Sequence, residues 1–289
     1  MKFLRSFVAF VLVVLAAQSV RAAEARVIRD VEYGQAAGVS LKLDVGIPPG
    51  DGPFPVAILV HGGGWTSGSK SGSDKPGSGS DITPWFDTFT AVGCVWFSID
   101  YRMLPTHRWP AQLEDTQTAI RWVKVHAAEY RGDPSRIVIV GHSAGGHIAL
   151  QAAVLGEGDT RVQAAIGYAP VSDLEFDAQV RGGASTGLQQ LFGVPRDLTP
   201  ESRKILLAGS PGSYIKPGLP PMLMLHGDAD RTVAIAMTRR FEEKMLAAGN
   251  VCDVIVLPRA PHGLLAWDKI VPGYRQQVAD WLRVHLRAQ

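Results

Sequence analysis

The sequence has 289 residues, of which 46% are hydrophobic and 19% are charged. This length and balance are typical of one large globular domain, which buries a core without needing cross-links. The formal net charge is +2, and no run of Lys and Arg provides the clustered positive charge that phosphate binding requires. We therefore expect no nucleic-acid partner.

The N-terminal segment has the pattern of a secretory signal peptide. Two basic residues precede an apolar run from Phe7 to Ala17, and small residues suited to cleavage follow around Ala22. This run is short for a transmembrane helix, which needs ~20 residues. We predict a signal peptide over residues 1–22, export to the periplasm or the medium, and no stable membrane anchor. Cleavage would leave 26 of the 29 basic residues against 27 acidic ones, a charge of about −1.

Short apolar runs follow along the chain and alternate, from residue 55 onward, with segments of helical period. The first two runs, at 25–33 and 39–45, are expected to form an antiparallel edge. The later runs are apolar almost without interruption, and such strands need a sheet that is covered on both faces. We therefore predict mostly parallel strands at 55–61, 95–101, 136–141, 164–169, 222–227 and 254–258.

Helical period marks three segments between and after these strands. In residues 110–130, Leu113 and Ile120 fall on one side, and residues 233–248 repeat apolar side chains every three or four positions. Residues 274–286 form the last such segment. The alternation of strands and helices predicts a doubly wound, mostly parallel α/β sheet.

Two stretches interrupt the alternation. Residues 66–84 are rich in Ser and Gly and are predicted to be a mobile loop. Residues 174–219 contain Gly, Pro and short helical pieces, and they are too short for an independent domain. We predict a small lid inserted at 174–219 into a single domain over residues 23–289.

The sequence GHSAG at 141–145 has the G-x-S-x-G form of a nucleophile elbow. It directly follows a predicted strand and precedes a helix-forming run, which is the context that the motif requires. Gly141 and Gly145 give room to a sharp turn, and Ser143 would then stand exposed beside the positive end of a helix. The alternative is a Gly/Ser turn without catalytic use.

A second glycine-rich motif, HGGGW at 61–65, directly follows the strand predicted at 55–61. Attack on an ester carbonyl creates an oxyanion, and backbone N–H groups approach it closely only where no Cβ intervenes. We predict an oxyanion hole made by the N–H groups of Gly63, Gly64 and Ala144. The alternatives are a purely structural turn and a phosphate cradle, although no G-K-[ST] follows at P-loop spacing.

The acid and the base are expected after the serine, in the order Ser, Asp or Glu, His. Asp228 and Asp230 both follow the strand at 222–227, and we predict that Asp230 is the acid while Asp228 orders the turn. His262 follows the last predicted strand, and its Nε2 would take the proton of Ser143. The predicted triad is therefore Ser143, Asp230 and His262.

The two cysteines, Cys94 and Cys252, lie in or next to predicted buried strands. Export permits a disulfide, but two buried thiols are the simpler interpretation. No Cys/His cluster has the spacing of metal ligands.

Several motifs together resemble one group of esterases. HGGGWTSGSK, DPSRIVIVGHSAGGHIAL and HGDADRTV occur in order, and the resemblance extends over residues 30–285. They are similar to the acetyl-xylan and feruloyl esterases of the α/β-hydrolase fold, close to the hormone-sensitive-lipase-like family. The resemblance implies hydrolysis of carboxylic esters without cofactor or metal, by the triad and oxyanion hole predicted above.

Three functions remain open from the sequence. The first is an exported serine esterase for short acyl groups, including acetyl groups of plant polysaccharide, with a small-molecule or polysaccharide-borne ester as its substrate. The second is a formamidase- or amidase-like hydrolase that uses the same triad. The third is a non-catalytic binding module, against which the intact Ser143, Asp230 and His262 argue.

Overall fold

The computed structural model describes residues 24–73 and 82–287, and the structural statements below concern these residues. The predicted signal peptide at 1–22 lies outside them. Within them, no helix is long and apolar enough to cross a membrane.

Eight strands form one sheet in the order β1-β2-β4-β3-β5-β6-β7-β8. Strands β3 to β8 are parallel to one another. At one edge of the sheet, β2 is antiparallel to both of its neighbours, β1 and β4. Their bounds are β1 (Arg26–Ala36), β2 (Val39–Ile47), β3 (Phe54–Val60), β4 (Val95–Ile99), β5 (Gly132–His142), β6 (Ala164–Tyr168), β7 (Met222–Gly227) and β8 (Cys252–Leu257). The predicted sheet and its antiparallel edge are both confirmed.

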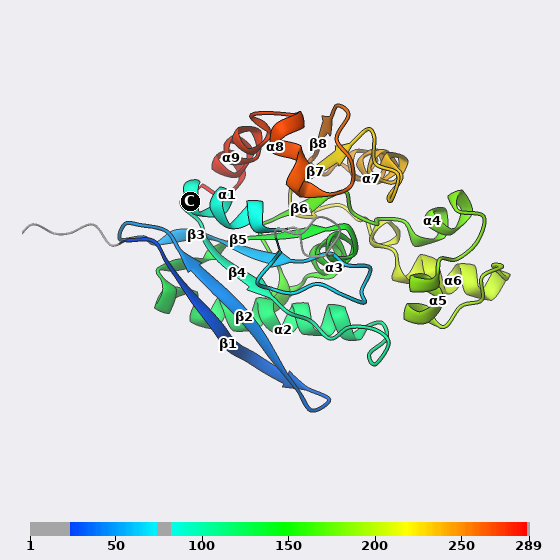
Figure 1. Ribbon diagram of the computed structural model, residues 1–289, viewed down its shortest axis with the longest axis horizontal. Coiled ribbons are helices and arrows are strands. Elements are labelled where there is room, and N and C mark those ends of the chain that lie inside the picture. The colour runs from blue at the N-terminus through cyan, green and yellow to red at the C-terminus, as the bar shows by residue number, and fades with distance from the viewer. Residues whose placement is uncertain (1–23, 74–81, 288–289) are drawn as a thin grey trace, which may run out of the picture.

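Helices cover both faces of the sheet (Figure 1). Side chains alternate along each central strand: Val56, Ile58 and Val60 of β3 pack toward one layer, and Ala57 and Leu59 pack toward the other. The first layer includes α2 (Ala111–His126), α3 (Ser143–Leu155) and α7 (Ile235–Ala247), and the second includes α1 (Thr83–Ala91), α8 (Trp267–Ile270) and α9 (Tyr274–His285). This arrangement is the predicted doubly wound fold.

One helix was not expected from the sequence. Helix α1 begins at Thr83, inside the stretch predicted as loop, and it buries Trp85 and Phe89 against the sheet. The described part of that stretch is also anchored, because the ammonium of Lys70 lies 3.1 Å from the buried carboxylate of Asp44. Of the predicted loop at 66–84, only residues 74–81 lie outside the described residues.

The predicted insertion at 174–219 contains three short helices, α4 (Leu174–Val180), α5 (Thr186–Phe192) and α6 (Pro200–Gly209). They gather at the end of the molecule away from the β1–β2 hairpin (Figure 1). Each begins with a side-chain cap, from Asp173, Ser185 and Thr199, which satisfies a backbone N–H of the first turn. Among the described residues, short 3₁₀ helices also occur: η1 (Ala127–Tyr130), η2 (Gly158–Thr160), η3 (Pro211–Ser213) and η4 (Leu264–Ala266).

A fully buried histidine joins this insertion to the core. The Nε2–H of His147, on α3, donates to the carbonyl oxygen of Gly209 at 2.8 Å. The His147 ring also contacts Trp65 and Trp109. Burial lowers the pKa of His147 from 6.5 to about 4, because the charged ring would lose its hydration.

This histidine links stability to pH. The unfolded chain takes up a proton at His147 near pH 6.5, whereas the folded protein does so only near pH 4. Stability is therefore full above about pH 6.5 and falls as the pH decreases toward 4. We expect this one group to lower the unfolding free energy by about 2 kcal/mol between roughly pH 7.5 and pH 5.

Urea unfolding of the wild type and of His147→Gln at both pH values tests this expectation. The variant should lose part of the pH dependence, while His107→Gln, a control at a partly exposed loop histidine, should keep it. An unchanged slope in His147→Gln would contradict the linkage.

Candidate active site

Ser143 stands at the turn between β5 and α3, where the backbone is strained. Its φ is +54°, a left-handed value that a non-glycine residue adopts only when its surroundings enforce it. A Cβ on Gly141 would lie 2.1 Å from the carbonyl oxygen of Gly145, and one on Gly145 would lie 2.2 Å from those of Val60 and His61. Both glycines are therefore required by close backbone contacts.

The HGGGW loop faces this turn. Gly63 has a φ of +106°, and a Cβ there would lie 2.0 Å from the carbonyl oxygen of Ser67. Within the described chain, the N–H groups of Gly63 and Gly64 donate no hydrogen bond. Ala144 lies in the first turn of α3, where backbone N–H groups have no partner inside the helix. Gly64 and Ala144 line a common pocket with Ser143, whereas Gly63 does not reach its wall.

Buried polar groups of Tyr101 and His61 hold the HGGGW loop in place. The hydroxyl of Tyr101 donates to the carbonyl oxygen of His61 at 3.0 Å, and the two rings stack with centroids 4.4 Å apart. The Nδ1–H of His61 donates to the carbonyl oxygen of Gly62, and burial lowers the pKa of His61 to about 4. His61 is thus a neutral ring that holds the loop.

The two candidate acids have different partners. Asp228 accepts a hydrogen bond from the backbone N–H of Arg259 and so orders the loop after β8. An oxygen of Asp230, Oδ2, lies 2.7 Å from Nδ1 of His262, and the carboxylate is completely buried. The structure therefore brings Asp230, and not Asp228, against His262.

Asp230 accepts further hydrogen bonds that keep it ionised. Its other oxygen, Oδ1, accepts from the N–H groups of Thr232 and Val233 at 2.7 and 2.9 Å. Burial by itself would raise the pKa of Asp230, but the hydrogen bonds from His226 and His262 outweigh it and hold the pKa well below its usual range. A charged carboxylate beside His262 fixes its Nδ1–H tautomer and leaves Nε2 as the basic atom.

His262 also lies next to the residue that precedes the serine. The Nε2–H of His142 donates to the carbonyl oxygen of His262 at 3.0 Å, and the ring centroids are 4.7 Å apart. Among the described residues, no hydrogen bond joins Ser143 Oγ to His262. In unliganded enzymes such contacts are often long and tighten only with substrate.

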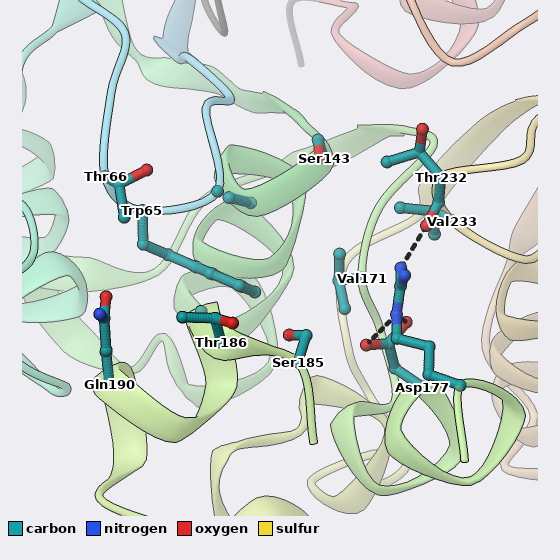
Figure 2. A pocket seen from close by; sticks show the side chains of 14 residues that line it. Trp65, Thr66, Ser143, Val171, Asp177, Ser185, Thr186, Gln190, Thr232 and Val233 are labelled. Atoms are coloured by element: carbon teal, nitrogen blue, oxygen red, sulfur yellow. Dashed lines mark hydrogen bonds and ion pairs between the residues drawn. The ribbon is translucent and has the colours of Figure 1, made fainter. Parts of the chain in front are cut away.

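A pocket of about 410 Å³ opens at Ser143. Ser143 and Thr232 lie on one side of it, and Ser185, Thr186 and Gln190 lie opposite (Figure 2). Its apolar wall consists of Trp65, Ala144, Val171 and Val233. The remaining lining comprises Gly64, Thr66, Asp177, Arg181 and Gly187.

Arg181 joins two parts of this site, the insertion and the loop that carries Asp230. Its Nε donates to both oxygens of Asp177 at 2.9 Å, and its Nη2 donates to the carbonyl oxygen of Thr232 on the Asp230 loop. The sequence indicated no role for Arg181 or His226: the Arg181 contact with Thr232 joins segments 51 residues apart, and the partners of His226 are near in the chain but belong to no motif. No group of three or more His, Cys, Asp or Glu side chains suited to a metal ion occurs in the part of the chain that the structure describes.

Comparison with known proteins agrees with this architecture. The family model BD-FAE matches residues 43–245. Esterase LipQ of Mycobacterium tuberculosis is 33% identical over 81% of this chain and 56% of its own length. The chain spans about half the length of three mycobacterial relatives that it matches, LipM, LipQ and LipC.

Matches to solved structures extend over a larger share of this chain than the match to LipQ. Thermogutta terrifontis esterase 2 phosphoramylated by tabun is 29% identical with a TM-score of 0.71, and the match covers 93% of this chain and 98% of that one. A truncated carbohydrate esterase from gut microbiota has a TM-score of 0.74 at 23% identity, with 90% and 96% covered, and it shows the fold alone. This chain therefore belongs to the BD-FAE family, within the α/β-hydrolase esterases.

Proposed function

We propose that this protein is a serine carboxylic-ester hydrolase that acts on short acyl esters. One arrangement carries the proposal: the strained Ser143 opens into a pocket beside Gly64, while the ionised Asp230 is hydrogen-bonded to His262, whose ring lies 4.7 Å from that of His142, the residue before the serine. A strained serine, a donor without a partner and a carboxylate–histidine pair have no common structural use, but together they serve acyl transfer.

The mechanism follows from these groups. His262 Nε2 takes the proton of Ser143 Oγ as that oxygen attacks the ester carbonyl. The resulting oxyanion accepts hydrogen bonds from the N–H groups of Gly63, Gly64 and Ala144, and losing one such donor costs about 3 kcal/mol of barrier. His262 then gives the proton to the leaving alcohol, and water releases the acyl group by the same sequence. Asp230 stabilises the imidazolium in both steps.

Pocket size and relatives support a short acyl group. A volume of about 410 Å³ must hold the acyl group and part of the alcohol, and the Trp65 ring forms one of its walls. Thermogutta terrifontis esterase 2, about 30% identical, has been solved with propionate and with butyrate bound. We infer the same range of acyl lengths for this chain.

The polar wall supports a hydroxyl-rich alcohol, such as the sugar of an acetylated plant polysaccharide. Ser185, Thr186 and Gln190 offer hydroxyl and amide groups, and the Asp177–Arg181 pair offers an acceptor and a donor. Sugars require such paired donors and acceptors, whereas a lipid alcohol would leave them without partners. Export, proposed from residues 1–22, would bring the enzyme to such polymers.

A panel of esters tests the activity and the alcohol together. We expect hydrolysis of p-nitrophenyl acetate and butyrate, weak hydrolysis of the decanoate, and release of acetate from acetylated xylan. In Ser143→Ala, kcat should fall by a factor on the order of 10⁶ without loss of the folded state, measured by circular dichroism. Turnover of N-formylkynurenine but of no ester would instead favour the amidase alternative, and full activity in Ser143→Ala would refute the nucleophile.

The choice of acid is tested by a matched pair of variants. Asp230→Asn keeps the shape of the side chain but removes the charge that fixes His262, so kcat should fall by roughly 10⁴. Asp228→Asn keeps an oxygen that can accept from Arg259 N–H and should retain most of the activity. Steady-state kinetics on p-nitrophenyl acetate measures both, and the reverse ranking would assign the acid to Asp228.

A further inference from the structure

We propose that His226 and Thr238 are positioning residues, which act on catalysis by fixing the tautomer of one imidazole and, through it, the orientation of the Asp230 carboxylate. This inference rests on the proposed function, because it concerns the acid of the same triad. It adds a second histidine to the site, which approaches the same carboxylate oxygen as His262. Neither residue lines the pocket of Ser143.

His226 is buried and surrounded by polar atoms at hydrogen-bonding distance. It lies near the end of β7, and both its side chain and that of Asp230 are inaccessible to solvent. Its Nε2 is 3.3 Å from Asp230 Oδ2 and 3.0 Å from the carbonyl oxygen of Val233. Its Nδ1 is 2.8 Å from the hydroxyl oxygen of Thr238. A histidine that only filled the core would not need this complete set of polar partners.

These partners select one tautomer. The carbonyl oxygen of Val233 and the carboxylate of Asp230 accept hydrogen bonds and cannot donate them, so Nε2 of His226 must carry a proton. In the neutral ring Nδ1 is then an acceptor, and the Thr238 hydroxyl is the donor that satisfies it. Thr238 thereby satisfies Nδ1 in this tautomer and helps to hold the ring with Nε2 toward the acid.

The Asp230 carboxylate has two N–H groups close to each of its oxygens. Oδ1 accepts from the two backbone N–H groups of Thr232 and Val233, and Oδ2 accepts from Nδ1–H of His262. The Nε2–H of His226, which also donates to the carbonyl oxygen of Val233, lies 3.3 Å from the same Oδ2. These four contacts restrict rotation about the bond that carries the carboxylate. Both histidines approach Oδ2 of Asp230. A loss of the His226 contact would therefore change the orientation of the carboxylate and the negative charge on the oxygen that accepts from His262.

Thr238 allows this role to be tested without removing a buried ring. Thr238→Val keeps the shape and removes the donor to Nδ1, whereas Thr238→Ser restores a hydroxyl. Thr116→Val is the matched control, because Thr116 is also fully buried on a helix, donates to a carbonyl oxygen, that of Gln112, and does not line the pocket of Ser143. Steady-state kinetics on p-nitrophenyl acetate gives kcat and KM for each variant.

We expect kcat of Thr238→Val to fall about tenfold with KM unchanged, since a buried acceptor left without its donor perturbs the group beyond it. Thr238→Ser should recover most of the rate, and Thr116→Val should match the wild type. Equal effects of Thr238→Val and Thr116→Val, or no recovery in Thr238→Ser, would overturn the inference.

A second readout does not depend on activity. Nitrogen-15 NMR of the folded wild type should show His226 with its proton on Nε2, and Thr238→Val should shift the downfield Nδ1–H proton of His262. If the wild type hydrolyses no ester but these signals behave as expected, the proposed function fails while the positioning role of His226 stands. A proton on Nδ1 alone of His226, or an unshifted His262 proton, would overturn the positioning role whatever the activity.

Discussion

The contact between Gly145 and the carboxyl end of β3 is the constraint on which the site depends. Any side chain at Gly145 would collide with the carbonyl oxygens of Val60 and His61, so the first turn of α3 lies directly against the strand that leads into the HGGGW loop. This contact brings the strained Ser143 and the free N–H of Gly64 to one pocket. Neighbouring parallel strands end at the same edge of a sheet, and the remaining catalytic candidates therefore arrive on the loops after β7 and β8.

Charge on these loops is organised around a single buried carboxylate. Asp230 stays ionised because two backbone N–H groups and two imidazoles donate to it, despite the burial that opposes its charge. Arg181 connects the same loop to the insertion through the carbonyl oxygen of Thr232 and the Asp177 carboxylate. Arg181 thus links the pocket wall formed by the insertion to the loop that carries Asp230. Both buried cysteines, Cys94 and Cys252, lie outside this system as free thiols.

The fold and the principal site residues could be predicted from sequence because both depend on local patterns. Apolar runs mark the buried parallel strands, and the elbow at 141–145 is defined by its own glycines. Helix α1 could not be predicted, because its buried residues Trp85 and Phe89 are only one turn apart and follow a stretch rich in Ser and Gly. Asp228 and Asp230 share one loop, and the structure distinguishes them by their partners, the N–H of Arg259 for Asp228 and the ring of His262 for Asp230.

Covalent labelling most directly tests whether Ser143 is the proposed nucleophile. Thermogutta terrifontis esterase 2 has been solved phosphorylated by paraoxon, a reagent that also suits this chain if the proposed mechanism holds. Peptide mass spectrometry after paraoxon treatment should place one diethylphosphoryl group on Ser143, with loss of activity in proportion to labelling. An adduct on another residue that accounts for the lost activity, or full activity with Ser143 labelled, would contradict the account.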